Sequence, residues 1–485
     1  MDRGELAKVL ETFVSTRFLM VIFVSVGTFL QYAQRVSFPM AIICMTNNTA
    51  MAMAQNHSSE ASQIDGEFLW DANDHAQLNS GFYYGYVLGH LPMGLIIQKV
   101  GAKWPGFVML FGYGIISIIS PYIAKLGISY FVAVRALSGL IVSGWYPSIY
   151  YLIPKWIILE ERGRMTSIGC AGSNVGSIFA MPLAGIMCAS SLGYLLIFQS
   201  WGVVSIGFAI LWAFIVYDSP FLHPRISQRE RDFLHSKIDK DDKDKHAKMK
   251  LPIISMLKSI SLWAYATVHY ALDWSLVFLL TSVPTYMKDV LQFSLQVNAM
   301  LSSLPYVGLF FGTLAFGFLS DLLITRSKLS LVATRKLVNS LALFPAAIFF
   351  SSMSFLDAEQ KFIAVTLLVL SLFFTSGSFA GAFMTPMDVA APYASLIFSF
   401  VNCIANTSGF FVPRLIAYMT PNSTAAEWRF VFYLTGAIIA LSATIFLIFA
   451  KADPEPWLNQ NQSKSHKNSN IEVELPLNED KKSTL

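Results

Sequence analysis

The sequence is poor in charged side chains, which make up 13% of its 485 residues, whereas 54% of the residues are hydrophobic. A soluble protein of this length cannot hide so much apolar surface in its cores and still cover itself with polar groups. This shortage of charge therefore excludes an ordinary soluble globular protein and indicates that the chain lies in lipid. The net charge of +4 is small and gives no indication of a nucleic-acid partner.

Cysteine is also scarce, because the chain has only Cys44, Cys170, Cys188 and Cys403, and each falls within an apolar stretch. Their spacing matches no disulfide framework and no zinc site, so we expect four unpaired cysteines packed in the core. The sequence lacks a phosphate-binding glycine loop, a cluster of metal ligands and a nucleophile elbow. Enzyme chemistry is therefore not indicated, and the only ions we expect are a co-transported Na⁺ or H⁺.

Apolar runs of about 20 residues recur along the chain, as membrane-spanning helices require. They lie at about 18–45, 77–98, 105–123, 127–152, 165–188, 194–217, 261–287, 297–320, 337–356, 362–385, 393–418 and 428–450. The pattern predicts an all-α membrane protein with about twelve spans in two six-helix halves. These halves are residues 1–217 and 261–450, joined by a central loop at 218–260 and followed by a polar tail at 451–485.

Positive charges orient the predicted spans. No Lys or Arg occurs between Val36 and Gln98, although this segment contains a polar loop at 46–76. The connection after the fourth span, by contrast, carries Lys155, Arg162 and Arg164. We therefore expect both termini and the central loop to be cytoplasmic, in the plasma membrane or in an endolysosomal or vesicular membrane.

Two kinds of short motif bear on this topology. Asn47, Asn56 and Asn422 begin N-x-[ST] sequons on the predicted outer side, and we expect all three to be glycosylated. The sequons at Asn406, inside a span, and Asn461, in the cytoplasmic tail, should stay unmodified. The chain end Ser483-Thr484-Leu485 fits the ligand of a PDZ domain, but three residues are few and a chance match is the better explanation.

A weak internal repeat relates the two halves. The second span ends with Gly94 and, four residues later, Gln98, and basic residues follow; the eighth ends with Gly317 and Asp321, followed by Arg326. This motif resembles the loop signature of the major facilitator superfamily, whose halves are parallel repeats. Further segments resemble its solute carrier 17 family: Lys155–Arg164, Pro284–Lys288, Leu301–Tyr306, Asp388–Ala394 and Glu427–Tyr433.

The resemblance implies a carrier that works by alternating access, because the family includes sialin, the vesicular glutamate and nucleotide transporters and the type I sodium/phosphate transporters. Its substrates would be small anions such as inorganic phosphate, urate, acidic sugars or carboxylates. In sialin-like members, glutamates tied to proton coupling stand where this chain has Ser138 and Val142, which cannot carry a proton. Leu272 takes the approximate place of a vesicular glutamate transporter arginine, which argues against glutamate as the substrate.

Ionisable side chains inside spans are expensive, so they are the first candidates for a site. Arg35 and Arg135 are the candidates for anion binding, because a guanidinium offers forked donors and keeps its charge. By resemblance, spans 1 and 4 line the central cavity. A fixed bridge between helices, or snorkelling for Arg35, remains the structural alternative. His90, Tyr83 and Tyr86 are further candidates for substrate contact.

His269 and Asp273 lie four residues apart on one predicted helix and therefore share a face. They could form a relay for protons or cations, or a self-satisfied pair with no part in transport. Two alternatives to the anion carrier stay open: a proton-coupled symporter of the sialic-acid type that uses this pair, and an anion channel or transport-dead sensor on the same scaffold.

Overall fold

In a computed structural model of the chain, the regular secondary structure of the described residues is entirely helical, apart from one isolated β-bridge. The described residues are 15–47, 66–70, 72–237, 253–283, 286–287, 290–293, 301, 303–326, 329–356, 358–421 and 424–455. The predicted sites at Asn56, Asn422 and Ser483–Leu485 lie outside them.

The N-terminal half contains the helices α2 (Thr16–Met45), α4 (Ala72–Val100), α5 (Lys103–Ala124), α6 (Ile128–Val142), α7 (Trp145–Trp156), α8 (Arg162–Cys188) and α9 (Tyr194–Ile215). Helices α6 and α7 are one membrane pass with a break between them. Pro147, near the start of α7, has no N–H to donate to the carbonyl of Ser143, so the regular helix is interrupted there.

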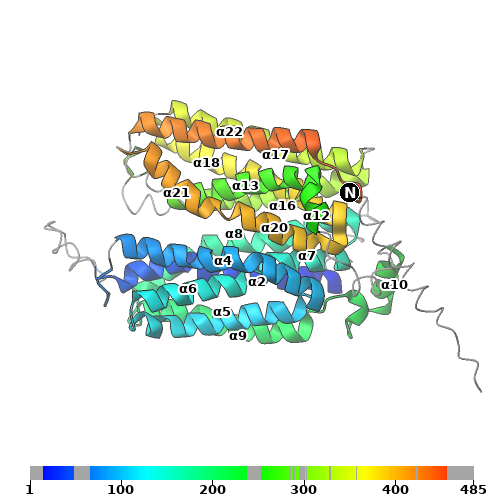
Figure 1. The fold of residues 1–485 in the computed structure, drawn as a ribbon, viewed down its shortest axis with the longest axis horizontal. Helices are drawn as coiled ribbons and strands as arrows, with labels where there is room; N and C mark the ends of the chain where they lie inside the picture. The colour runs from blue at the N-terminus through cyan, green and yellow to red at the C-terminus, as the bar shows by residue number, and fades with distance from the viewer. Residues whose placement is uncertain are drawn as a thin grey trace, which may run out of the picture.

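The C-terminal half contains α13 (Ile260–Thr281), α16 (Leu304–Arg326), α17 (Leu331–Ser352), α18 (Lys361–Thr375), α19 (Thr385–Ala390), α20 (Ala394–Ala405), α21 (Ser408–Met419) and α22 (Ala425–Phe449). Within the predicted central loop, α10 (Gln228–Lys237) and α12 (Ile253–Lys258) are short helices. Figure 1 shows the two halves as two layers of helices that run side by side along one direction.

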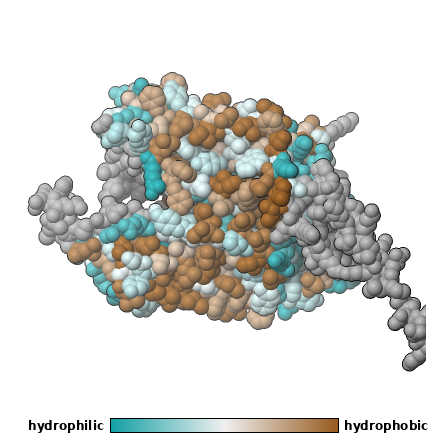
Figure 2. Space-filling view, viewed as in Figure 1, coloured by the Kyte–Doolittle hydropathy of each residue, from teal (hydrophilic) through white to brown (hydrophobic). Residues whose placement is uncertain are grey.

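Nine segments of the described chain are long and apolar enough to cross a membrane. One of them, Lys361–Ile416, contains two passes, the first made by α18 and α19 and the second by α20 and α21. Helices α4 and α13 complete the twelve passes but are less apolar, and they carry His90, His269 and Asp273. The predicted twelve-span, all-α architecture is confirmed. Figure 2 shows hydrophobic side chains over the middle of the visible face and hydrophilic ones toward both helix ends.

The two ends of the helices are referred to by what lies there. The termini side is where α2 begins at Thr16 and α22 ends at Phe449. Here Glu230 of α10 caps α2 by accepting hydrogen bonds from the backbone N–H groups of Thr16 and Arg17, each at 3.0 Å. The loop side is the opposite end, where residues 66–70 fold back onto α2 through a bridge between Phe68 and Thr46. That the termini side is cytoplasmic stays a prediction.

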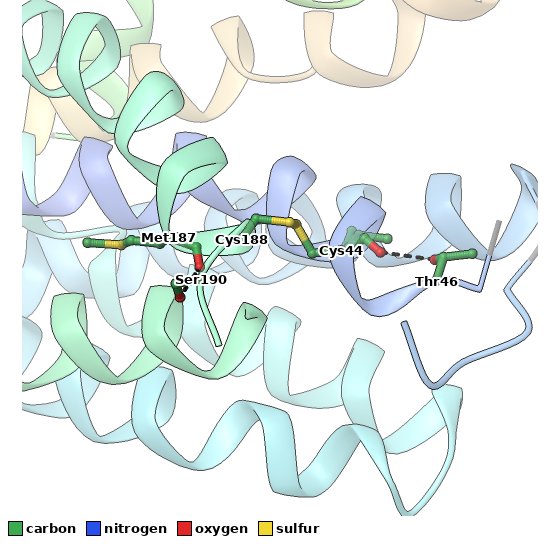
Figure 3. Close-up of a disulfide and its surroundings, with 6 residues drawn as sticks. Cys44, Thr46, Met187, Cys188 and Ser190 are labelled. Carbon is green, nitrogen blue, oxygen red and sulfur yellow. Dashed lines mark hydrogen bonds between the residues drawn. A yellow bond between two sulfur atoms is a disulfide. The ribbon is translucent and has the colours of Figure 1, made fainter. Parts of the chain in front are cut away.

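A disulfide joins Cys44, next to the last residue of α2, to Cys188 at the end of α8, with their Cα atoms 6.0 Å apart (Figure 3). The prediction of four unpaired cysteines is therefore wrong for this pair. The two cysteines are separated by 144 residues, and only the packing of α2 along α8 brings them together on the loop side. Cys170, which is buried, and Cys403, which is partly exposed, are free, as predicted.

Candidate functional site

Arg35 of α2 is surrounded by aromatic rings at the boundary between the two halves. Its guanidinium carbon lies 4.9 Å from the ring centres of Phe82 and Tyr83, 5.3 Å from that of Tyr86 and 5.7 Å from that of Tyr32. A cation over ring faces is stabilised without losing its charge. The side chain is partly exposed and forms no ion pair with any described residue, so its charge stays available to a solute.

The rings of Tyr32, Phe82, Tyr83 and Tyr86 are called the Arg35 cage below. Two residues of the C-terminal half face this cage. The Asp273 carboxylate of α13 and the Tyr306 hydroxyl of α16 both interact electrostatically with Arg35. Like Arg35, both residues are partly exposed. Asp273 makes no hydrogen bond or ion pair with any other part of the described chain. The arrangement therefore places a cation on one half and a carboxylate on the other, with tyrosines of both halves around the cation.

Arg135 of α6 lies deeper, inside the N-terminal half. Only 6% of it is exposed, and its guanidinium carbon is 3.4 Å from the centre of the Phe38 ring. It borders a cavity of about 20 Å³ that Gln34, Tyr113 and Trp201 also line. That space holds about one water molecule, which is too little for an organic anion. In this conformation, Arg135 therefore does not share a compartment with Arg35.

Phe82 separates the two arginines, because its ring lies within 4.9 Å of the Arg35 guanidinium and 5.2 Å of that of Arg135. Ser138 and Val142, the two residues that cannot carry a proton, lie on α6 together with Arg135. Ser138 is fully buried and donates a hydrogen bond to the carbonyl of Arg135 at 2.6 Å, and Val142 is packed in an apolar cluster. Val142 thus packs in the same cluster as Phe82 and Tyr86, two of the rings around Arg35, but neither Ser138 nor Val142 brings a charge to that site.

His269 does not pair with Asp273 in this structure. Its Nδ1 is bonded to the Tyr265 hydroxyl, one turn before it rather than one turn after it, at 3.0 Å. His90 of α4 is also fully buried and is bonded through Nε2 to the Asn402 amide of α20 at 2.7 Å. The two histidines interact with each other, whereas Asp273 faces the Arg35 cage.

The halves are held together on the termini side by buried charges. Arg162 and Arg164 belong to α8 of the N-terminal half, and their partners belong to the C-terminal half. Arg162 lies 3.6 Å from the Asp388 carboxylate, and the Asp321 carboxylate accepts a hydrogen bond from the backbone N–H of Arg164 at 2.8 Å. The termini side is therefore closed in the conformation in which Arg35 is partly exposed.

Several residues of this region were not predicted from the sequence. Tyr32 and Tyr306 complete the aromatic surroundings of Arg35, and Asn402 contacts His90. The sequence singles out the arginine, histidine and aspartate side chains of the spans and one tyrosine cluster, and these three residues belong to neither group. A search for every polar side chain in the apolar spans would have included these three, but nothing in the sequence ranks them.

A family model of the Major Facilitator Superfamily matches residues 24–413 of the chain. With the twelve-helix fold and a charged site between the halves, this defines the class: the protein is a membrane transporter of that superfamily. Human sialin is 30% identical over 472 residues, covering 93% of each chain. Vesicular glutamate transporter 1 of Bos taurus is 26% identical over 458 residues, covering 93% of this chain and 80% of its own. The chain belongs to solute carrier family 17.

Solved structures agree on the fold. The proton:xylose symporter XylE, determined with bound 6-bromo-6-deoxy-D-glucose, has a TM-score of 0.67 at 15% sequence identity. The match covers 90% of this chain and 97% of that one. At this identity the likeness establishes the arrangement of the helices and not the substrate.

Proposed function

We propose that this protein is a secondary-active carrier of small anions that binds its substrate at Arg35. The observation that carries the proposal is a permanent cation that is partly exposed between the two halves and has no ion-pair partner among the described residues. A charge placed within the membrane is costly, so a site that keeps it unneutralised is built for a charged solute. Inorganic phosphate and carboxylates both fit the forked donors of a guanidinium.

Asp273 supplies a mechanism for coupling. A carboxylate that faces Arg35 repels an incoming anion unless a proton or a cation neutralises it first. Binding of the anion at Arg35 and binding of H⁺ or Na⁺ at Asp273 therefore strengthen each other, and this coupling is reciprocal. His269 is bonded to Tyr265 and therefore does not act on Asp273 directly.

The names of the relatives support the anion proposal, since sialin and a vesicular glutamate transporter span nearly the same length of chain. The disulfide supports a loop side that faces an oxidising compartment, either a vesicle lumen or the cell exterior. Both observations fit a plasma membrane or an endolysosomal or vesicular membrane with the termini side in the cytoplasm.

The test is uptake into proteoliposomes of phosphate, urate, sialic acid and glutamate, with the sodium gradient, the pH gradient and the voltage set separately. Arg35→Ala should abolish saturable uptake of the transported anion. Arg414→Ala is the matched control, because it removes an arginine that is exposed on α21. Uptake by Arg35→Ala at the control rate, with equal amounts of protein in the vesicles, would refute the proposed site.

Two further measurements distinguish ion-coupled from uncoupled transport, and a carrier from a channel. Asp273→Asn should abolish the dependence of uptake on the ion gradient while anion exchange persists, because the variant carboxamide needs no neutralising ion. Preloaded substrate should accelerate uptake through a carrier, whereas a channel shows no such counterflow. Arg135→Ala should leave the initial binding step intact, since Arg135 lies on the far side of Phe82.

A further inference from the structure

A buried polar cluster lies between the two halves, on the termini side of the Arg35 cage. It consists of His90 on α4, Asn402 on α20 and His269 on α13, and these side chains are 0%, 4% and 2% exposed. His90 follows Tyr86 of the cage by one helical turn, and their rings are 4.2 Å apart. No charged group of the described chain forms an ion pair within this cluster.

The amide of Asn402 is the centre of the cluster. It donates to Nε2 of His90 at 2.7 Å, which joins the C-terminal half to the N-terminal half. Its oxygen accepts a hydrogen bond from the side chain of Asn406 at 3.0 Å, and this bond fixes which way the amide points. The same amide also interacts with His269 and with the hydroxyl of Tyr86.

The surroundings of the cluster are aromatic and closely packed. The His269 ring lies 4.4 Å from that of Phe383 and 5.2 Å from that of Phe398, and Phe398 stacks on Tyr150 of the other half at 4.1 Å. A hydrogen bond that breaks in such a place leaves its donor and acceptor without water to replace it. The bond between Asn402 and His90 therefore favours the closed arrangement of this layer more than an exposed bond would.

Opening the route from Arg35 to the termini side requires α4 to part from α20. Gly94 of α4 packs so closely against Ser399 that a side chain larger than hydrogen would not fit. Asn406 lies in the break between α20 and α21, and both bonds of its amide run back to Asn402. The backbone can bend at a break in a helix. The break between α20 and α21 therefore lies where α20 could move away from α4.

We propose that Asn402 is a positioning residue of the transport cycle. Its amide holds His90 while the site is open toward the loop side, and it releases His90 when the termini side opens. Asn402 does not contact the anion; it sets the ratio of the two conformations. Tyr86 belongs to the Arg35 cage and also contacts this amide. A movement of Tyr86 when the anion binds would therefore alter the Asn402–His90 bond. The inference rests on the proposed function only for the identity of the solute.

The experiment measures the conformation directly and needs no substrate. Ser167 of α8 is 1% exposed and is packed against Gly317 of the other half on the termini side. Ser167→Cys, in a protein without the free thiols of Cys170 and Cys403, reports opening by its rate of alkylation. Asn402→Leu in that background should raise the rate about tenfold, the effect expected for loss of one buried hydrogen bond.

The control is Asn339→Leu, the same change at a fully buried asparagine of α17. The Asn339 amide makes no hydrogen bond with the described residues, so the change breaks no bond between the halves. It should leave the alkylation rate unchanged. The exchange variant His90→Asn/Asn402→His should restore a rate close to that of the parent, because it reverses the two partners across the interface. His90→Leu should also raise the rate, and the effects of the two changes should not add in full, because both remove the same bond.

An unchanged alkylation rate in Asn402→Leu, or equal acceleration by Asn339→Leu, would overturn the proposal. If Asn402→Leu does not fold, His90→Leu with the exchange variant makes the same test. In transport assays, a shifted ratio appears as an apparent anion KM raised from the loop side by a similar factor. Failure of anion uptake in all variants would refute the proposed function and leave the alkylation result standing.

Discussion

Asp388 and Arg335 form a forked ion pair, with Nε of the guanidinium 2.7 Å from one carboxylate oxygen and a terminal nitrogen 3.4 Å from the other. Their side chains are 0% and 3% exposed. The other terminal nitrogen of Arg335 donates to Ser320 at 2.8 Å, so the guanidinium is satisfied on several sides. Arg162 of the other half approaches the same carboxylate at 3.6 Å.

Asp388→Asn should therefore be among the most destabilising single changes on the termini side. It leaves the buried Arg335 without its counter-charge, a loss of about 3–5 kcal/mol in the free energy of unfolding. Unfolding in mixed detergent micelles measures this. Arg162→Gln removes only the longer contact and should lower the free energy of unfolding clearly less. A loss as large as that of Asp388→Asn would contradict this and show that the contact between the halves supplies most of the stabilisation.

Removal of the Cys44–Cys188 disulfide should lower thermal stability. The bond closes a loop of 144 residues, and removal of a native disulfide typically costs about 2–5 kcal/mol. The double variant Cys44→Ala/Cys188→Ala, or wild-type protein in reductant, should show the same lower Tm. Cys170→Ala removes a cysteine outside the bond, so it should keep the disulfide and show the same fall of Tm in reductant as the wild-type protein. Equal Tm values with and without reductant would contradict the bond.

His223, outside the spans on the termini side, makes stability depend on pH. The residue is 5% exposed and its Nδ1 accepts a hydrogen bond from the backbone N–H of Arg225 at 3.2 Å. Burial lowers the pKa of His223 below its ordinary value of about 6.5. The unfolded chain then binds a proton that the folded chain does not, so stability falls as pH drops from about 6.5 toward the lowered pKa.

The variant His223→Asn keeps an acceptor at the Nδ1 position and cannot titrate. We expect the wild-type Tm to decline more steeply than the variant Tm between pH 7 and pH 5. Above pH 7 the difference between the two proteins should be constant, because His223 is neutral in both folded and unfolded chains. Parallel curves over the whole range would exclude His223 as a source of acid sensitivity.

The sequons test the orientation of the chain. Glycosidase treatment should shift the mobility of the wild-type protein, and Asn→Gln changes at Asn47, Asn56 and Asn422 should each reduce that shift. Changes at Asn406 and Asn461 should have no effect. Asn406 is 9% exposed within the bundle and its amide is bonded to the preceding helix, so a glycosyltransferase cannot reach it. A glycan on Asn461 would place the termini side outside the cytoplasm.

The sequence identified Arg35 because an arginine within an apolar run is rare and costly. It identified Arg135 by the same reasoning, yet the two differ in place: one side chain faces the other half, and the other faces a small cavity beyond Phe82. The direction of a side chain around a helix depends on how that helix is rotated against its neighbours. Hydropathy has no information about this rotation when a span is apolar on every face.

The sequence by itself determined that the chain is a membrane protein of twelve helices in two related halves, because hydrocarbon leaves few other structures for long apolar runs. Tertiary structure alone decided which residues meet. Cys44 pairs with Cys188, and His90 bonds to Asn402 although 312 residues separate them. Contacts of a few ångströms between distant residues depend on packing at the helix interfaces, which no local pattern in the sequence records.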